Sequence, residues 1–103
     1  MLHPKFIITL KGVFRMGMVH LHEDLLKGGE HCIGGGYFEI HHDSKEICLY
    51  GKSYDFGPPL WSMLDTLKVP KEYLGYSIVY KSDESPTDEL EISSFLKIEY
   101  VDN

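Results

Sequence analysis

The chain has 103 residues, of which 43% are hydrophobic and 13% aromatic, and this predicts one globular domain rather than a disordered segment. The formal net charge is −6 and arginine occurs once, which argues against a nucleic-acid-binding protein because such proteins need clustered cations. No stretch approaches the ~20 apolar residues of a membrane span, and no signal peptide is visible. The two cysteines, Cys32 and Cys48, are too few for a disulfide framework, so we expect reduced thiols in a cytoplasmic protein with no membrane contact.

Strand patterns dominate the first half of the chain. Residues 5–10 form a continuous, β-branched run that is typical of a buried strand, and residues 13–19 form a second extended segment. The runs 37–41 and 46–50 flank a polar turn and therefore predict a hairpin.

Two helices are also predicted. The first begins at about Glu23, where acidic residues suit the positive end of a helix, and it ends at Gly28. The second covers residues 59–67. An apolar stripe at helical spacing marks its core-facing side: Leu60, Met63, Leu64 and Leu67. A core position for Leu60 implies that Leu60→Ala would destabilise the domain.

The rest of the chain predicts two further strands, at residues 75–80 and 94–101, separated by an exposed acidic loop over residues 81–91. The sequence thus predicts an α/β fold in which residues 1–103 form one domain. Its architecture is a single mixed sheet of about six strands with two helices packed on it.

Residues 19–26 concentrate side chains that can carry chemistry. His20 and His22 are two positions apart, so both would point to one face of an extended segment. A strand-to-helix junction at or just before His22 would offer backbone N–H groups to an anion. A histidine placed there can act as an acid, a base or a nucleophile in phosphate chemistry. The alternative is that His22 is only a polar residue at the start of a helix.

Four segments in order resemble the protein histidine phosphatase family, also called the Janus family. They are the strand at residues 5–8, His22 with Asp24 two positions later, the Cys-Ile-Gly-Gly-Gly segment at 32–36, and the Leu-Tyr-Gly-Lys-Ser-Tyr-Asp-Phe-Gly-Pro segment at 49–58. The likeness covers roughly residues 5–80. It implies a small cytosolic α/β hydrolase that removes phosphate from phosphohistidine in a protein or peptide substrate, without a metal or another cofactor.

The resemblance also implies site residues. His22 matches the catalytic histidine, as nucleophile or general base. Lys5 matches a phosphate-site lysine on the first strand, and Ser53 matches a loop serine that contacts phosphate. The backbone N–H groups of Glu23 and Asp55 match two further phosphate donors.

Several residues depart from the family pattern. Leu21 replaces a tyrosine, Tyr37 replaces an arginine, and Glu23 and Asp55 stand where alanines are usual. An Asp55 carboxylate would repel a phosphate dianion unless its side chain turned to solvent. These departures keep open a second interpretation, in which the domain has the same fold but only binds an anion or a protein.

A zinc site is the third interpretation. His20 and His22, joined by His41, His42 or Asp24, have the residue types that zinc prefers. The spacing is a weak signal, because adjacent His41 and His42 would face opposite sides of a strand. We therefore expect no metal.

Overall fold

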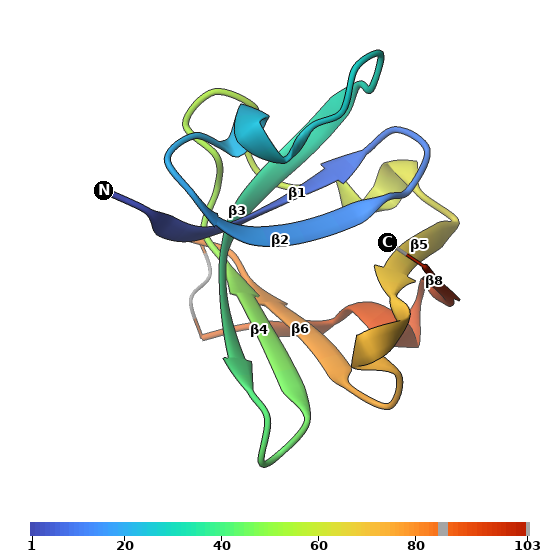
Figure 1. The fold of residues 1–103 in the computed structure, drawn as a ribbon. Helices are drawn as coiled ribbons and strands as arrows, with labels where there is room; N and C mark the ends of the chain where they lie inside the picture. The colour runs from blue at the N-terminus through green and yellow to red at the C-terminus, as the bar shows by residue number, and fades with distance from the viewer. Residues whose placement is uncertain (85–86, 103) are drawn as a thin grey trace.

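The computed structural model describes residues 1–84 and 87–102, which form eight strands and four short 3-10 helices (Figure 1). The strands are β1 (His3–Thr9), β2 (Phe14–Val19), β3 (Cys32–His41), β4 (Glu46–Tyr50), β5 (Thr66–Pro70), β6 (Ser77–Lys81), β7 (Glu89–Glu91) and β8 (Lys97–Val101). The 3-10 helices are η1 (His22–Leu25), η2 (Trp61–Met63), η3 (Lys71–Tyr73) and η4 (Ile92–Ser94).

The strands form two sheets. The main sheet has the order β2-β1-β3-β4-β6-β7, and all its pairs are antiparallel except β4 with β6. The second sheet consists of the parallel pair β5 and β8. An isolated parallel bridge between Val13 and Lys68 joins the two sheets near the start of β2. The predicted hairpin is confirmed, because β3 and β4 pair from Tyr37 opposite Tyr50 to His41 opposite Glu46.

The predicted α/β class is wrong, because the described residues contain only short 3-10 turns where helices were expected, and the domain is strand-rich. Residues 22–25 form a single short turn, since four residues cannot offset the cost of starting an α-helix. In the described part of the chain, no helix is long and apolar enough to cross a membrane. The predicted loop at 81–91 contains the short strand β7, and its residues Ser85 and Pro86 lie outside the described residues.

The second predicted helix is replaced by η2 followed by β5. Leu67 belongs to β5, where it pairs with Ile98 of β8, a contact between segments far apart in the sequence. The apolar stripe is therefore divided: Leu64 and Leu67 are buried, whereas Leu60 is 45% exposed and Met63 is 53% exposed. The predicted core position of Leu60 is wrong for this reason.

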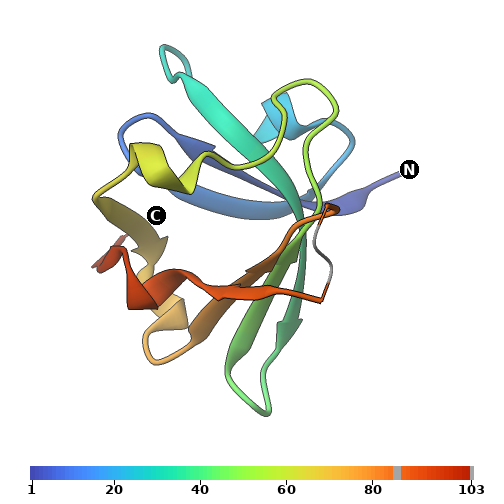
Figure 2. The same cartoon turned by 180° about the vertical axis from the view of Figure 1, so that it is seen from behind.

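The hydrophobic core fills the space between the two sheets. Figures 1 and 2 show β5 and β8 opposite the curved main sheet. Phe6 lies at the centre, with its ring stacked on Trp61 at a centroid distance of 6.1 Å and tilted against Phe14 at 5.8 Å. Because side chains alternate along a strand, burying Phe6 and Ile8 on this side turns Lys5 and Ile7 to the outer face of the main sheet.

Candidate functional site

His22 lies at the start of η1 and is buried, with 5% of its surface exposed, whereas the other histidines are exposed. Its Nε2 atom lies 2.8 Å from the carbonyl oxygen of Gly36 on β3. A carbonyl can only accept a hydrogen bond, so Nε2 carries the proton and donates. In the neutral ring the lone pair is therefore on Nδ1.

The glycine segment of β3 makes room for this ring. A Cβ atom on Gly35 would lie 3.1 Å from Cδ2 of His22 and 2.3 Å from the carbonyl oxygen of Phe6, so only glycine fits at this position. The edge formed by Nε2 and Cδ2 thus rests against the β3 backbone. Nδ1, on the other edge of the imidazole, is turned away from that backbone.

The environment of His22 favours the uncharged ring. Burial is the largest effect and lowers the pKa of His22 below its usual value of 6.5, and the positive charge of Lys5 lowers it further. The Gly36 carbonyl and the negative charge of Asp55 act in the opposite direction. The net lowering keeps His22 neutral at pH 7, the form that a nucleophile or a general base requires.

Lys5 lies on β1 opposite Tyr37 of β3, and its side chain is buried. Its Nζ atom donates a hydrogen bond to the carbonyl oxygen of His20, in the turn between β2 and η1. Lys5 therefore fixes the segment that carries His22 and also places a positive charge beside it.

Ser53 connects the loop after β4 to the same glycine segment. Its backbone N–H donates to the carbonyl oxygens of Gly35 at 3.0 Å and Gly57 at 3.1 Å. Its Oγ atom accepts from the N–H of Phe56 at 3.1 Å, and the residue is 1% exposed. The hydroxyl of Ser53 thus holds the loop in shape.

Glu23 and Asp55 are exposed; Glu23 follows His22 in the chain, and Asp55 is near enough for its charge to act on His22. Among the hydrogen bonds of the described residues, neither backbone N–H has an acceptor. These two N–H groups can therefore donate to an anion. The helix predicted to begin here is absent, because η1 has only four residues, so free N–H groups and not a helix dipole are what this segment offers an anion.

Two contacts of the site were missed from the sequence. One is the hydrogen bond from His22 to Gly36, and the other is the edge-on packing of the His22 ring against Tyr37, with centroids 5.6 Å apart. The second had a signal in the sequence, because Tyr37 follows Gly35 by two positions and so shares its face of β3. The first had none, because it depends on how η1 folds over β3.

The structure separates the histidines that the zinc interpretation would combine. His20 is exposed and accepts a hydrogen bond from the amino terminus at 3.2 Å, whereas His22 is buried. His41 and His42 lie at the far end of β3, in and beside the hairpin turn. Over residues 1–84 and 87–102, no group of three or more histidine, cysteine, aspartate or glutamate residues is arranged to hold a metal ion.

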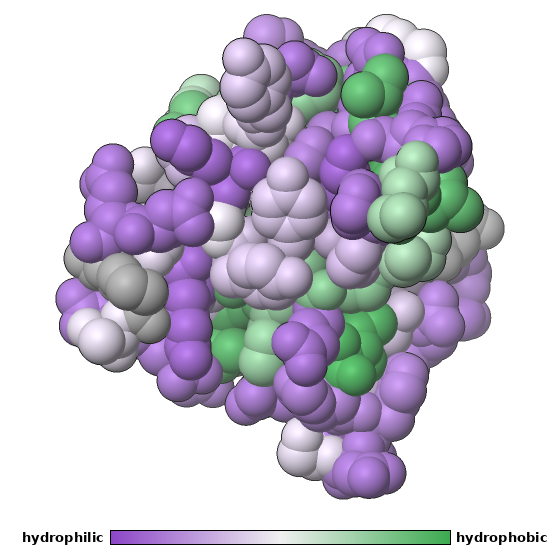
Figure 3. Space-filling view, turned by 90° about the vertical axis from the view of Figure 1, so that its left-hand side faces the viewer, coloured by the Kyte–Doolittle hydropathy of each residue, from purple (hydrophilic) through white to green (hydrophobic). Residues whose placement is uncertain are grey.

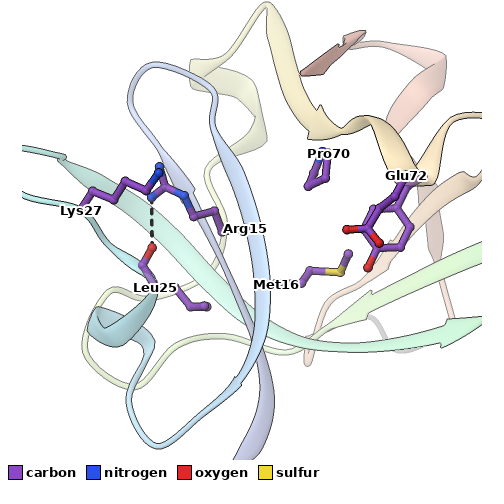
Figure 4. Close-up of a pocket in the computed structure, with 7 residues that line it drawn as sticks. Arg15, Met16, Leu25, Lys27, Pro70 and Glu72 are labelled. Atoms are coloured by element: carbon purple, nitrogen blue, oxygen red, sulfur yellow. Dashed lines mark hydrogen bonds between the residues drawn. The ribbon is translucent and has the colours of Figure 1, made fainter. Parts of the chain in front are cut away.

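A separate depression of about 230 Å³ lies between β2 and the junction of β5 with η3 (Figure 4). Arg15 lines it, but its guanidinium donates to the carbonyl oxygen of Leu25 at 3.0 Å and to both carboxylate oxygens of Glu30. The Arg15 charge is thus neutralised within the fold. This depression is a poor site for phosphate.

The structure therefore brings most of the expected site residues to one place. Lys5 and Asp55 are both close enough to His22 for their charges to act on its ring, and Ser53 is bonded to the glycine on which His22 packs. Comparisons of the chain with protein-family models, with curated proteins and with solved structures found no match.

Proposed function

We propose that this domain is a metal-independent phosphatase that removes phosphate from phosphohistidine in a protein or peptide. The observation that carries this proposal is the state of His22. It is buried and uncharged, its Nε2–H is held by Gly36, and its Nδ1 lone pair is turned away from the sheet. A histidine fixed in this way has one tautomer and one reactive nitrogen.

The surroundings of His22 suit a phosphoryl group. A phosphoryl transition state spreads negative charge over three oxygens and needs cations or N–H donors to stabilise it. Lys5 supplies a positive charge, and the N–H groups of Glu23 and Asp55 supply donors. Two routes use the Nδ1 lone pair: direct attack on phosphorus to form a phosphorylated His22, or removal of a proton from the attacking water.

One observation favours a second function, a non-catalytic domain that binds an anion or a protein. Lys5 already donates to His20, and Ser53 Oγ already accepts from Phe56, so both groups have structural roles. Asp55 also brings a negative charge to the site. Under this alternative the domain would bind phosphate without turning it over.

The proposed compartment is the cytoplasm. Cys32 and Cys48 are free thiols and both are partly buried. Burial and the neighbouring Glu46 raise the pKa of Cys48 to about 12, so this thiol is a poor nucleophile and is not part of the chemistry. Free thiols of this kind are typical of a reducing compartment.

The experiment that tests the proposal measures release of phosphate from a phosphohistidine peptide in the presence of a chelator. We expect turnover by the parent and by His20→Ala, and a loss of at least a hundredfold in His22→Ala. His20 is a matched control because it is a neighbouring but exposed histidine. Turnover that is equal in the parent and His22→Ala would exclude the catalytic role. Phosphate binding without turnover in the parent would favour the non-catalytic alternative.

Two further readouts refine the assignment. Acid-quenched samples from the first turnover would contain phosphorylated His22 if this residue attacks phosphorus, and none if it activates water. The pKa of His22 lies below 6.5, so the rate should hold above pH 6.5 and fall as the ring is protonated at lower pH. A rate that falls on raising the pH from 6.5 to 8 would contradict a role for the neutral ring.

A further inference from the structure

Two tyrosines stand side by side on the outer face of the main sheet, next to His22. The strand register places Lys5 opposite Tyr37, Tyr37 opposite Tyr50, and Tyr50 opposite Lys81. Residues that are paired across strands point to the same face, so these four form one row across β1, β3, β4 and β6. Within this row the rings of Tyr37 and Tyr50 are 5.9 Å apart and tilted by 30°.

The candidate catalytic residue His22 lies beside this row. Tyr37 is half-buried, and its ring packs edge-on against the His22 ring with the centroids 5.6 Å apart. Its aromatic neighbour in the row is Tyr50, which is 42% exposed. This side of the molecule is the left-hand side of Figure 1. In Figure 3 its hydrophilic surface surrounds a paler centre with a hydrophobic area beneath. Aromatic faces beside a polar reactive group are suited to hold a planar ring.

We propose that Tyr37 and Tyr50 bind the leaving group of the substrate and select a planar ring over a leaving group that has no ring. The proposal rests on the phosphatase function proposed above and assigns the residues that recognise the imidazole of phosphohistidine. Tyr37 and Tyr50 are then specificity-determining residues.

The geometry of phosphoryl transfer supports this position for the leaving group. The attacking atom lies ~3–3.5 Å from phosphorus before reaction. The leaving nitrogen is bonded to phosphorus on the opposite side, in line with the attacking atom. The leaving ring is therefore displaced from His22 by more than one ring diameter. The rings of Tyr37 and Tyr50 follow one another from His22 at successive centroid separations of 5.6 and 5.9 Å, and so offer aromatic surface beside the reactive histidine.

The bond changes leave an aromatic ring as the leaving group. Hydrolysis breaks the N–P bond, forms an O–P bond from water and places one proton of that water on the leaving imidazole nitrogen. With that single proton the leaving imidazole is neutral, so the tyrosine rings would hold it by aromatic packing and not as a cation.

The test compares two small substrates that share an N–P bond and differ in the ring, N-phosphoimidazole and phosphoramidate. We expect Tyr37→Leu and Tyr50→Leu each to lower the ratio of kcat/KM for N-phosphoimidazole to kcat/KM for phosphoramidate. The expected decrease is about two- to tenfold, the range for one aromatic contact. Tyr37→Phe and Tyr50→Phe should restore the parent ratio. Tyr54→Leu is the matched control, because this nearby tyrosine is 97% exposed and its ring packs on nothing described. Its ratio should equal that of the parent.

Two outcomes overturn the inference while leaving the phosphatase function standing: an unchanged ratio in both leucine variants, or the same loss in Tyr54→Leu. Failure of the parent to hydrolyse either compound would instead refute the phosphatase function. In that case the ring preference is read from binding, by NMR titration of the parent and Tyr37→Leu with each compound. Preferential binding of N-phosphoimidazole that disappears in Tyr37→Leu supports ring recognition by the tyrosines. Equal or absent binding of the two compounds overturns it.

Discussion

Gly35→Ala is the substitution that most directly tests how the site is built. Gly35 lies on β3, between the β1 backbone and the His22 ring. An added Cβ would lie 2.3 Å from the carbonyl oxygen of Phe6 and 3.1 Å from Cδ2 of His22. Ordinary contacts of a Cβ atom are 3.4–4 Å, so the first overlap exceeds one ångström.

The backbone overlap decides the magnitude. β1 and β3 are central strands with hydrogen-bonded neighbours on both sides, so neither can move without disturbing the ladder. Overpacking of this kind typically costs ~1–3 kcal/mol. With a urea m-value of ~1–3 kcal/mol/M for a small domain, the midpoint of unfolding should fall by roughly 1 M. His22 must also shift, so we expect turnover to fall more than folding alone explains.

Urea denaturation followed by tryptophan fluorescence measures this effect, because Trp61 is buried in the core. Gly28→Ala is the matched control. No atom lies within 4 Å of its added Cβ, and its φ is not positive, so alanine there should be neutral or stabilise by ~0.4–1 kcal/mol. Equal midpoints for Gly35→Ala and Gly28→Ala would refute the reasoning, because they would show that β3 and His22 do not approach as closely as described.

Two further predictions concern stability. Leu67→Ala should lower the free energy of unfolding by ~2–5 kcal/mol because Leu67 is fully buried. Leu60→Ala, at a position 45% exposed, should lower it by less than about 1 kcal/mol. Equal urea midpoints for the two variants would contradict this difference in burial. Glu30 is bonded to Arg15, which lowers the pKa of this carboxyl from 4.5 to about 2. Its contribution should be complete above pH 4.5 and lost as the pH falls toward 2, and Glu30→Gln should flatten stability over that interval; a pH profile identical to that of the parent would contradict the ion pair.

The local signals of strands were readable from the sequence. The β-branched run after Pro4 became β1, and the two alternating runs around a polar turn became the β3–β4 hairpin. Both depend on interactions between residues close in the chain, which is why composition and period were sufficient. The candidate site was indicated by the family resemblance, in which His22, the triple glycine and Ser53 occur in the family's order, and not by composition or period.

The tertiary structure decided what the stretch at 59–67 became. Apolar residues three and four apart fit a helix, but they fit a short turn followed by a buried strand equally well. Pairing with β8 selected the second arrangement, burying Leu67 and leaving Leu60 at the surface. A short segment has little preference of its own, so contacts made with a strand about thirty residues away outweigh it.

The chemical state of His22 was also decided by the tertiary structure. The sequence shows a histidine beside acidic residues, and from that alone its ring could be charged or neutral, exposed or buried. The fold places it against Gly35, bonds its Nε2–H to Gly36 and brings Lys5 and Asp55 near it. Burial, hydrogen bonding and neighbouring charge set a pKa, and each depends on residues that only folding brings together.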